Sequence, residues 1–152
     1  MITLIANRAS TVRRWAGSGF IALGAYQVGL GIYFAVFRPS LLPEDARFIG
    51  QPLPPSLELW LDLVFTVMGG QMAALGIAVL ALAARSFGAA PRSRFDIGAF
   101  ALVALSSAGL MSLVNFVLDS DFKWLLLIPS ILWVIAVALA VLSARSPPYG
   151  SR

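Results

Sequence analysis

The sequence predicts an all-α integral membrane fold: an up-down four-helix transmembrane bundle with both termini cytoplasmic. Three observations support this prediction. Hydrophobic residues make up 59% of the 152 residues and charged residues only 12%, whereas a soluble domain usually contains about 25% charged residues. Four long stretches contain no charged side chain. The basic residues gather on alternate connections between those stretches, as they do on the cytoplasmic side of membrane proteins.

Each uncharged stretch has the roughly 20 residues that cross a bilayer core about 30 Å thick. The predicted spans are 15–37, 60–84, 97–118 and 124–144, within a single membrane domain. The second uncharged run is 63–84, and the predicted span begins earlier, at Trp60, because tryptophan favours the membrane interface. The first span is too long for the core of a cleaved signal peptide, which has about 7–15 residues, so we expect it to be retained.

The distribution of charge sets the expected orientation. An even number of spans places both termini on one side of the membrane, and eight of the eleven basic residues fall on that side. These are Arg8, Arg13, Arg14, Arg85, Arg92, Arg94, Arg145 and Arg152. Since cytoplasmic loops are enriched in Lys and Arg, that side is predicted to be cytoplasmic, in a bacterial inner membrane. The asymmetry indicates contact with membrane lipids and not a nucleic-acid partner.

The outer connection, 38–59, is the only long loop that the spans leave. Pro43 is suited to the first position of a short helix, with Glu44 and Asp45 in its first turn and Gly50 at its end. Arg47 is spaced to pair with Glu44. Two interpretations remain open. The loop is either an ordered cap over the bundle or a docking surface on which Glu44, Asp45 and Arg47 meet a partner.

Polar side chains recur at the middle of the spans. At 1.5 Å per residue they fall within a narrow layer, formed by Tyr26, Gln27, Gln71, Ser106, Ser107 and Trp133. The first interpretation of this layer is interhelical hydrogen bonding. The second is a pocket for a small ligand, a quinone or a lipid, and the third is a conduction path. A transport path usually carries an ionisable group at depth, and this layer has none.

Small residues predict where the first two spans pack. Gly17, Gly24 and Gly31 recur every seven residues in the first span. Gly70, Ala74 and Ala78 recur every four residues in the second, with Gln71 at the border. Such stripes allow close contact between helices in a membrane. We therefore expect these two stripes to face neighbouring helices and not lipid.

The chain contains no His and no Cys, which removes several kinds of chemistry. Haem ligation by His or Cys, iron–sulfur clusters, zinc sites built on imidazole or thiolate, and Ser-His-Asp catalysis all need those residues. No cofactor, metal site or catalytic residue is predicted. An integral enzyme is therefore the third of three function hypotheses.

The segments YFAVFRPSLLPEDARFIG and VFTVMGGQMAALGIAVL, at 33–50 and 64–80, resemble a group of small uncharacterised four-span bacterial membrane proteins. That group has a glycine-rich first helix, an acidic outer loop with proline and a second helix with glycine. The resemblance covers about the first half of the chain. It implies a four-helix protein of the bacterial inner membrane and brings no activity with it.

Two further hypotheses about function follow. The first is a non-enzymatic multi-pass protein that acts as an accessory or assembly component of a membrane complex, with other membrane-protein subunits or a second copy as partner. The alternative is a ligand-, quinone- or lipid-binding bundle, or a minor transporter, that uses the polar layer. Co-purified chains favour the first, and a retained small molecule favours the second.

Overall fold

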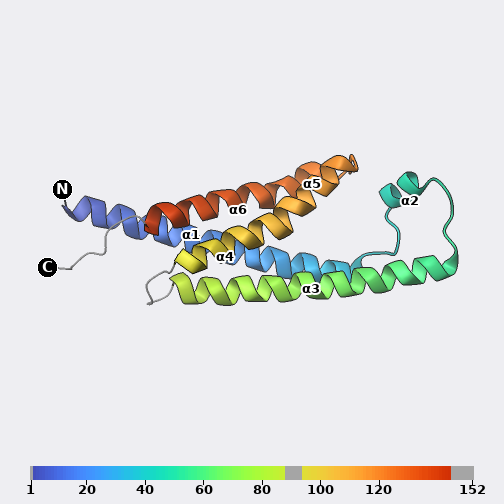
Figure 1. Cartoon of the computed structure of the whole chain (residues 1–152), viewed down its shortest axis with the longest axis horizontal. Helices are drawn as coiled ribbons and strands as arrows, with labels where there is room; N and C mark the ends of the chain where they lie inside the picture. Colours follow the sequence, from blue (N-terminus) through green and yellow to red (C-terminus); the bar gives the residue numbers. More distant parts are fainter. Residues whose placement is uncertain (1, 88–93, 145–152) are drawn as a thin grey trace. The chain divides into compact units, whose positions relative to one another are not determined.

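The computed structural model describes residues 2–87 and 94–144 (Figure 1). All of the regular structure in these residues is helical. Eight elements follow one another along the chain: α1 Ile2–Ile32, η1 Tyr33–Phe37, α2 Pro43–Ile49, α3 Pro55–Phe87, α4 Arg94–Val103, η2 Ala104–Gly109, α5 Leu110–Val117 and α6 Lys123–Ala144. The two η elements are π-helical and continue the α-helices beside them.

Four helical stretches in the described residues are long and apolar enough to cross a membrane: Thr11–Phe37, Pro55–Phe87, Phe95–Val117 and Lys123–Leu142. They confirm the number and the places of the predicted apolar helices. The second differs most, because it begins five residues before Trp60. Pro55 can open a helix since its missing N–H needs no partner there, and the Pro54 carbonyl accepts from the N–H groups of Leu57 and Glu58.

The short helix α2 confirms the prediction for the outer loop. Pro43 is its first residue, and Asp45 accepts a hydrogen bond from the N–H of Leu42 at 2.8 Å. That N–H is one of the donors that a helix start leaves without an intrahelical partner. Gly50 ends the helix with φ of 73°, and its N–H donates to the Ala46 carbonyl. Glycine suits this left-handed position because it has no Cβ.

The described chain divides into two compact units. One comprises the described residues within 1–23 and 79–152, and the other comprises Gly24–Ala78. The long helices α1 and α3 each begin in one unit and end in the other.

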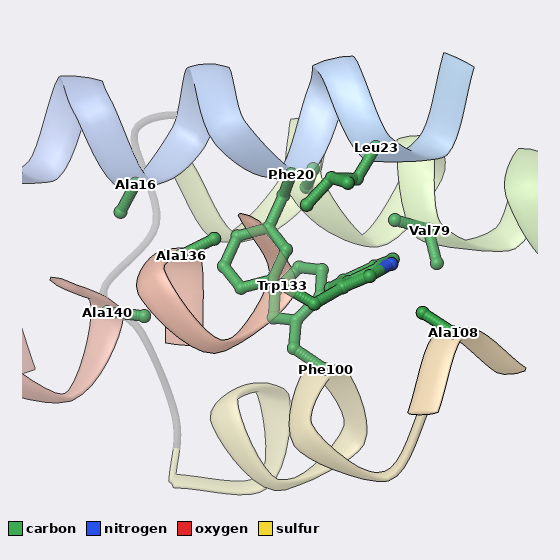
Figure 2. Close-up of a cluster of buried hydrophobic side chains, with 10 residues drawn as sticks. Ala16, Phe20, Leu23, Val79, Phe100, Ala108, Trp133, Ala136 and Ala140 are labelled. Carbon is green, nitrogen blue, oxygen red and sulfur yellow. The ribbon is translucent and has the colours of Figure 1, made fainter. Parts of the chain in front are cut away.

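The core of the first unit is a cluster of aromatic rings surrounded by alanines (Figure 2). The ring of Phe20 stacks on Phe100 with centroids 3.8 Å apart and tilts against Trp133 at 5.4 Å. The buried alanines are Ala16, Ala83, Ala108, Ala136 and Ala140. Their small side chains let the helices approach closely enough for three large rings to share one space.

The second unit is organised by direct contact between helix backbones. A Cβ on Gly31 would lie 2.4 Å from the N atom of Ala73 and 2.6 Å from the carbonyl O of Gly69. A Cβ on Gly76 would lie 2.8 Å from the carbonyl O of Gly24. At both positions a backbone atom of α1 or α3 is the nearest neighbour of the added Cβ. Gly24 and Gly31 are seven residues apart, as are Gly69 and Gly76, so two antiparallel helices meet twice in matching register.

This contact with α1 uses only one of the two predicted stripes. Gly24 and Gly31 lie in the contact, as expected. The stripe of Gly70, Ala74 and Ala78 does not, because all three are exposed and a Cβ on Gly70 would have nothing within 4 Å. The contact residue is Gly69, which differs from Gly70 by a rotation of about 100° around the helix.

Candidate functional site

The six residues of the predicted polar layer divide equally between the two units. Tyr26, Gln27 and Gln71 belong to the unit Gly24–Ala78, and Ser106, Ser107 and Trp133 belong to the other. Each group is best understood from its own surroundings.

In the second unit, only one of the three polar residues is buried. Gln27 is 3% exposed and lies on the helix that carries Gly24 and Gly31. Tyr26 is 37% exposed. Gln71 is exposed and is the middle residue of the 33-residue helix α3. The three side chains therefore do not gather into one enclosed site within this unit.

Gln71 lies on the side of α3 that α1 leaves uncovered. Gly69 and Gly76 mark the contact with α1 and are buried. At 100° per residue, Gln71 points about 160° away from Gly69. Val67, Gly70, Ala74 and Ala78 share this side of the helix with Gln71 and are exposed as well. We call these five residues the Gln71 face.

In the first unit, the two serines of the layer bond to their own helix. Ser107 Oγ donates to the carbonyl O of Val103 at 2.6 Å, and Ser106 Oγ lies 3.5 Å from the same oxygen. Both serines belong to the π-helical segment η2, and π-helical turns occur often at functional sites. Both hydroxyls are directed to a backbone carbonyl of their own helix.

Trp133 is the most enclosed residue of the layer, with 1% of its surface exposed. Figure 2 shows its indole among Phe20, Phe100 and Val79, with the nitrogen on the side towards Val79. Its Nε1 has no hydrogen-bond partner among the described residues. A buried indole N–H normally finds an acceptor. Among the described residues of the predicted layer, this donor is the buried polar atom without an acceptor.

A polar contact between two serines joins α5 to α6, and neither serine was among the predicted site residues. The hydroxyls of Ser112 and Ser130 lie 2.6 Å apart. Ser112 Oγ is 2.8 Å from the carbonyl O of Leu126, and Ser130 Oγ is 2.7 Å from that of Ala108. The two serines have two hydroxyl hydrogens between them, so at most two of these three contacts can be hydrogen bonds at any one time.

A signal for this pair exists in the sequence. Ser112 and Ser130 are equally distant from Asp121, which lies in the short turn between the two helices. In an antiparallel hairpin, residues equally distant from the turn lie opposite each other. The turn itself contains Asp119 with φ of 52° and an ion pair from Lys123 to Asp119. The hydrogen bond from Lys123, and then its charge, lower the pKa of Asp119.

The predicted docking residues have different surroundings. Asp45 is engaged within the chain: besides the N–H of Leu42, it binds Arg38 Nη2 at 2.6 Å. Glu44 is half-buried and Arg47 is exposed on α2. Of these three residues, Asp45 therefore has a structural role that the loop itself requires.

Arg38 is the centre of this arrangement, and the predicted site residues did not include it. Its side chain is only 4% exposed, and its guanidinium carbon lies 3.6 Å from the centroid of the Phe65 ring. Nη1 donates to the carbonyls of Pro39 and Ser40. An Arg stacked on an aromatic face and paired with a carboxylate is held strongly once it is shielded from water. Arg38 fastens α2 to α3.

No group of His, Cys, Asp or Glu in the part of the chain that the structure describes is arranged to hold a metal ion. Comparisons with protein-family models, with curated proteins and with solved structures found no match to this chain. The chemistry of the site must therefore be inferred from its own residues.

Proposed function

We propose that the chain is a multi-pass protein of the bacterial inner membrane, with both termini in the cytoplasm, that acts as a non-enzymatic accessory or assembly component of a membrane complex. The length and apolar character of four helices support insertion. The placement of eight basic residues on the side of the termini supports the orientation.

One observation carries the proposed role, namely the exposure of Gln71 at the middle of α3. At 1.5 Å per residue, each end of this helix is about 24 Å from Gln71. In a bilayer, Gln71 then lies too deep for its side chain to reach the interface. Its amide would face hydrocarbon, where an unpaired amide costs several kcal/mol. A helix from another subunit removes that cost by supplying a donor and an acceptor.

The neighbours of Gln71 suit such a subunit. Gly70, Ala74 and Ala78 are small and exposed, so another helix can approach α3 closely at this level. The serines of the polar layer do not favour an enzyme over this role. Ser106 and Ser107 bond to Val103 of their own helix, and such serines are poorly placed to bind a substrate.

The test is mild extraction into lipid nanodiscs followed by native mass measurement. The wild-type particle is expected to contain an additional chain, and Gln71→Leu is expected to lose it while remaining folded. Ser106→Ala is the matched control, because it removes an exposed hydroxyl of another apolar helix. A wild-type particle with one chain only, or an additional chain that is insensitive to Gln71→Leu, contradicts the proposal.

A second candidate function is supported by the unpartnered Nε1 of Trp133. The carbonyl oxygen of a quinone or lipid is a suitable acceptor for that buried N–H, which would make the protein a ligand-binding bundle. Organic extraction of the purified particle is the test. This candidate predicts a bound quinone or lipid that Trp133→Phe releases, while Trp124→Phe, which alters an exposed indole, retains it. Equal retention by both variants contradicts it.

A further inference from the structure

We infer that the helix that packs on the Gln71 face is α3 of a second copy of this chain, in parallel and about a two-fold axis. This inference rests on the proposed function, since it identifies the partner that the proposed assembly requires.

The first argument is open space at the contact. A Cβ on Gly70 would meet nothing within 4 Å, so this position has the open space at its surface that close approach of another helix requires. Ala74 and Ala78 continue this opening at intervals of one turn. A small residue at every fourth position is the pattern on which parallel helices cross closely in membranes.

The second argument is the direction of the partner. Two copies of one chain insert in the same sense, because the same basic residues orient both. Their α3 helices are therefore parallel, and a two-fold axis along the membrane normal brings each residue at the crossing to its own counterpart at the same depth. Gln71 then meets Gln71.

The third argument is that the polar group is complementary to itself. The amide of Gln71 has two N–H donors and a carbonyl acceptor. Two such amides can exchange reciprocal hydrogen bonds, which satisfy both without any other residue. The α3 stretch between Asp62 and Arg85 contains no charged residue, so the approach of two copies brings no like charges together within the crossing.

The chain offers a direct test because it contains no cysteine. A single introduced cysteine cannot form a disulfide within its own chain, and a crosslinked product of twice the chain mass identifies a second copy whose Cα atom lies within about 7 Å. We expect oxidation in native membranes to produce dimers from Val67→Cys, Gln71→Cys and Ala74→Cys. Leu132→Cys on α6 and Leu102→Cys on α4 are the controls, since both positions are exposed on other apolar helices.

A second measurement addresses affinity by energy transfer between labelled copies diluted in lipid. Gly70→Leu is expected to weaken the dimer about tenfold or more by blocking close approach, and Gly29→Leu, which also has open space around it, is expected to leave it unchanged. Gln71→Leu should weaken the dimer, and Gln71→Asn should preserve part of the affinity because it retains an amide.

The outcomes separate the inference from the proposed function. Crosslinks at Val67, Gln71 and Ala74 that exceed those of the two controls several-fold support the second copy. Equal crosslinking at all five positions overturns it. If the particle instead contains a different chain that Gln71→Leu removes, the assembly role stands and the second copy is wrong. If neither a second copy nor another chain is found, both are wrong.

Discussion

Adding one methyl group at Gly31 tests the backbone contact between α1 and α3 more directly than any other change. The Cβ of Gly31→Ala would lie 2.4 Å from the N atom of Ala73 and 2.6 Å from the carbonyl O of Gly69. Both obstacles are backbone atoms, so no rotamer change can relieve them. Ordinary contacts between such atoms need about 3.5 Å. The two helices must therefore separate by about 1 Å.

The free energy of this separation can be compared with the gain from replacing glycine. Overpacking costs about 1–3 kcal/mol, and a backbone obstacle places Gly31→Ala near the upper end. Alanine in place of glycine contributes about 1 kcal/mol of helix propensity. The net loss of stability is then about 2 kcal/mol. Gly29→Ala is the matched control on the same helix, because a Cβ there has nothing within 4 Å, and it should gain up to about 1 kcal/mol.

Reversible unfolding in mixed detergent micelles, followed by tryptophan fluorescence, measures both variants under one condition. The two free energies of unfolding should differ by about 3 kcal/mol, with Gly31→Ala the less stable. Identical values for the two variants, or a more stable Gly31→Ala, would refute the conclusion that the helix backbones touch at this position.

Three other predictions concern the polar contacts. Ser130→Ala should lower the free energy of unfolding by about 1 kcal/mol by removing its bond to Ser112. In a double-mutant cycle, Ser112→Ala should cost less stability in the Ser130→Ala background than in the wild type. Arg38→Met should cost about 2 kcal/mol, because it removes a partly buried ion pair and a cation–π contact. Arg38→Lys retains the positive charge and should cost less, and equal unfolding free energies for the two variants would contradict this. The lowered pKa of Asp119 means that its ion pair stabilises the turn above the ordinary pKa and is lost as pH falls through the lowered one. NMR titration should show the Asp119 pKa rising in Lys123→Met, and no rise would exclude Lys123 as the cause.

The apolar helices and the ends of α2 are predictable from sequence because their causes are local. A run without charge fixes each apolar helix, and Pro43 and Gly50 fix the ends of α2 through their own backbone preferences. Each of these signals is contained in neighbouring residues, and the structure confirms them.

The packing faces are harder to predict, as Gly69 and Gly70 illustrate. Both are glycine, and Gly70 begins the more regular stripe of small residues. Which of the two glycines meets α1 depends on α1 itself, where Gly24 and Gly31 are seven residues apart and match Gly69 and Gly76. A pattern read on one helix alone therefore does not show which face of α3 meets α1. The same limit applies to Ser106 and Ser107, since depth in a span does not reveal that a hydroxyl bonds to the backbone of its own helix.

The contact at Gly31, Gly69 and Gly76 also has an evolutionary consequence. Every mutation of a glycine codon that changes the amino acid adds at least one carbon, so drift offers no neutral replacement at these positions. Gly29 and Gly98 have open space around them and are free to vary. Distant descendants of a common ancestor should therefore retain paired glycines seven residues apart in two successive apolar helices, even after the rest of their sequences have diverged beyond recognition.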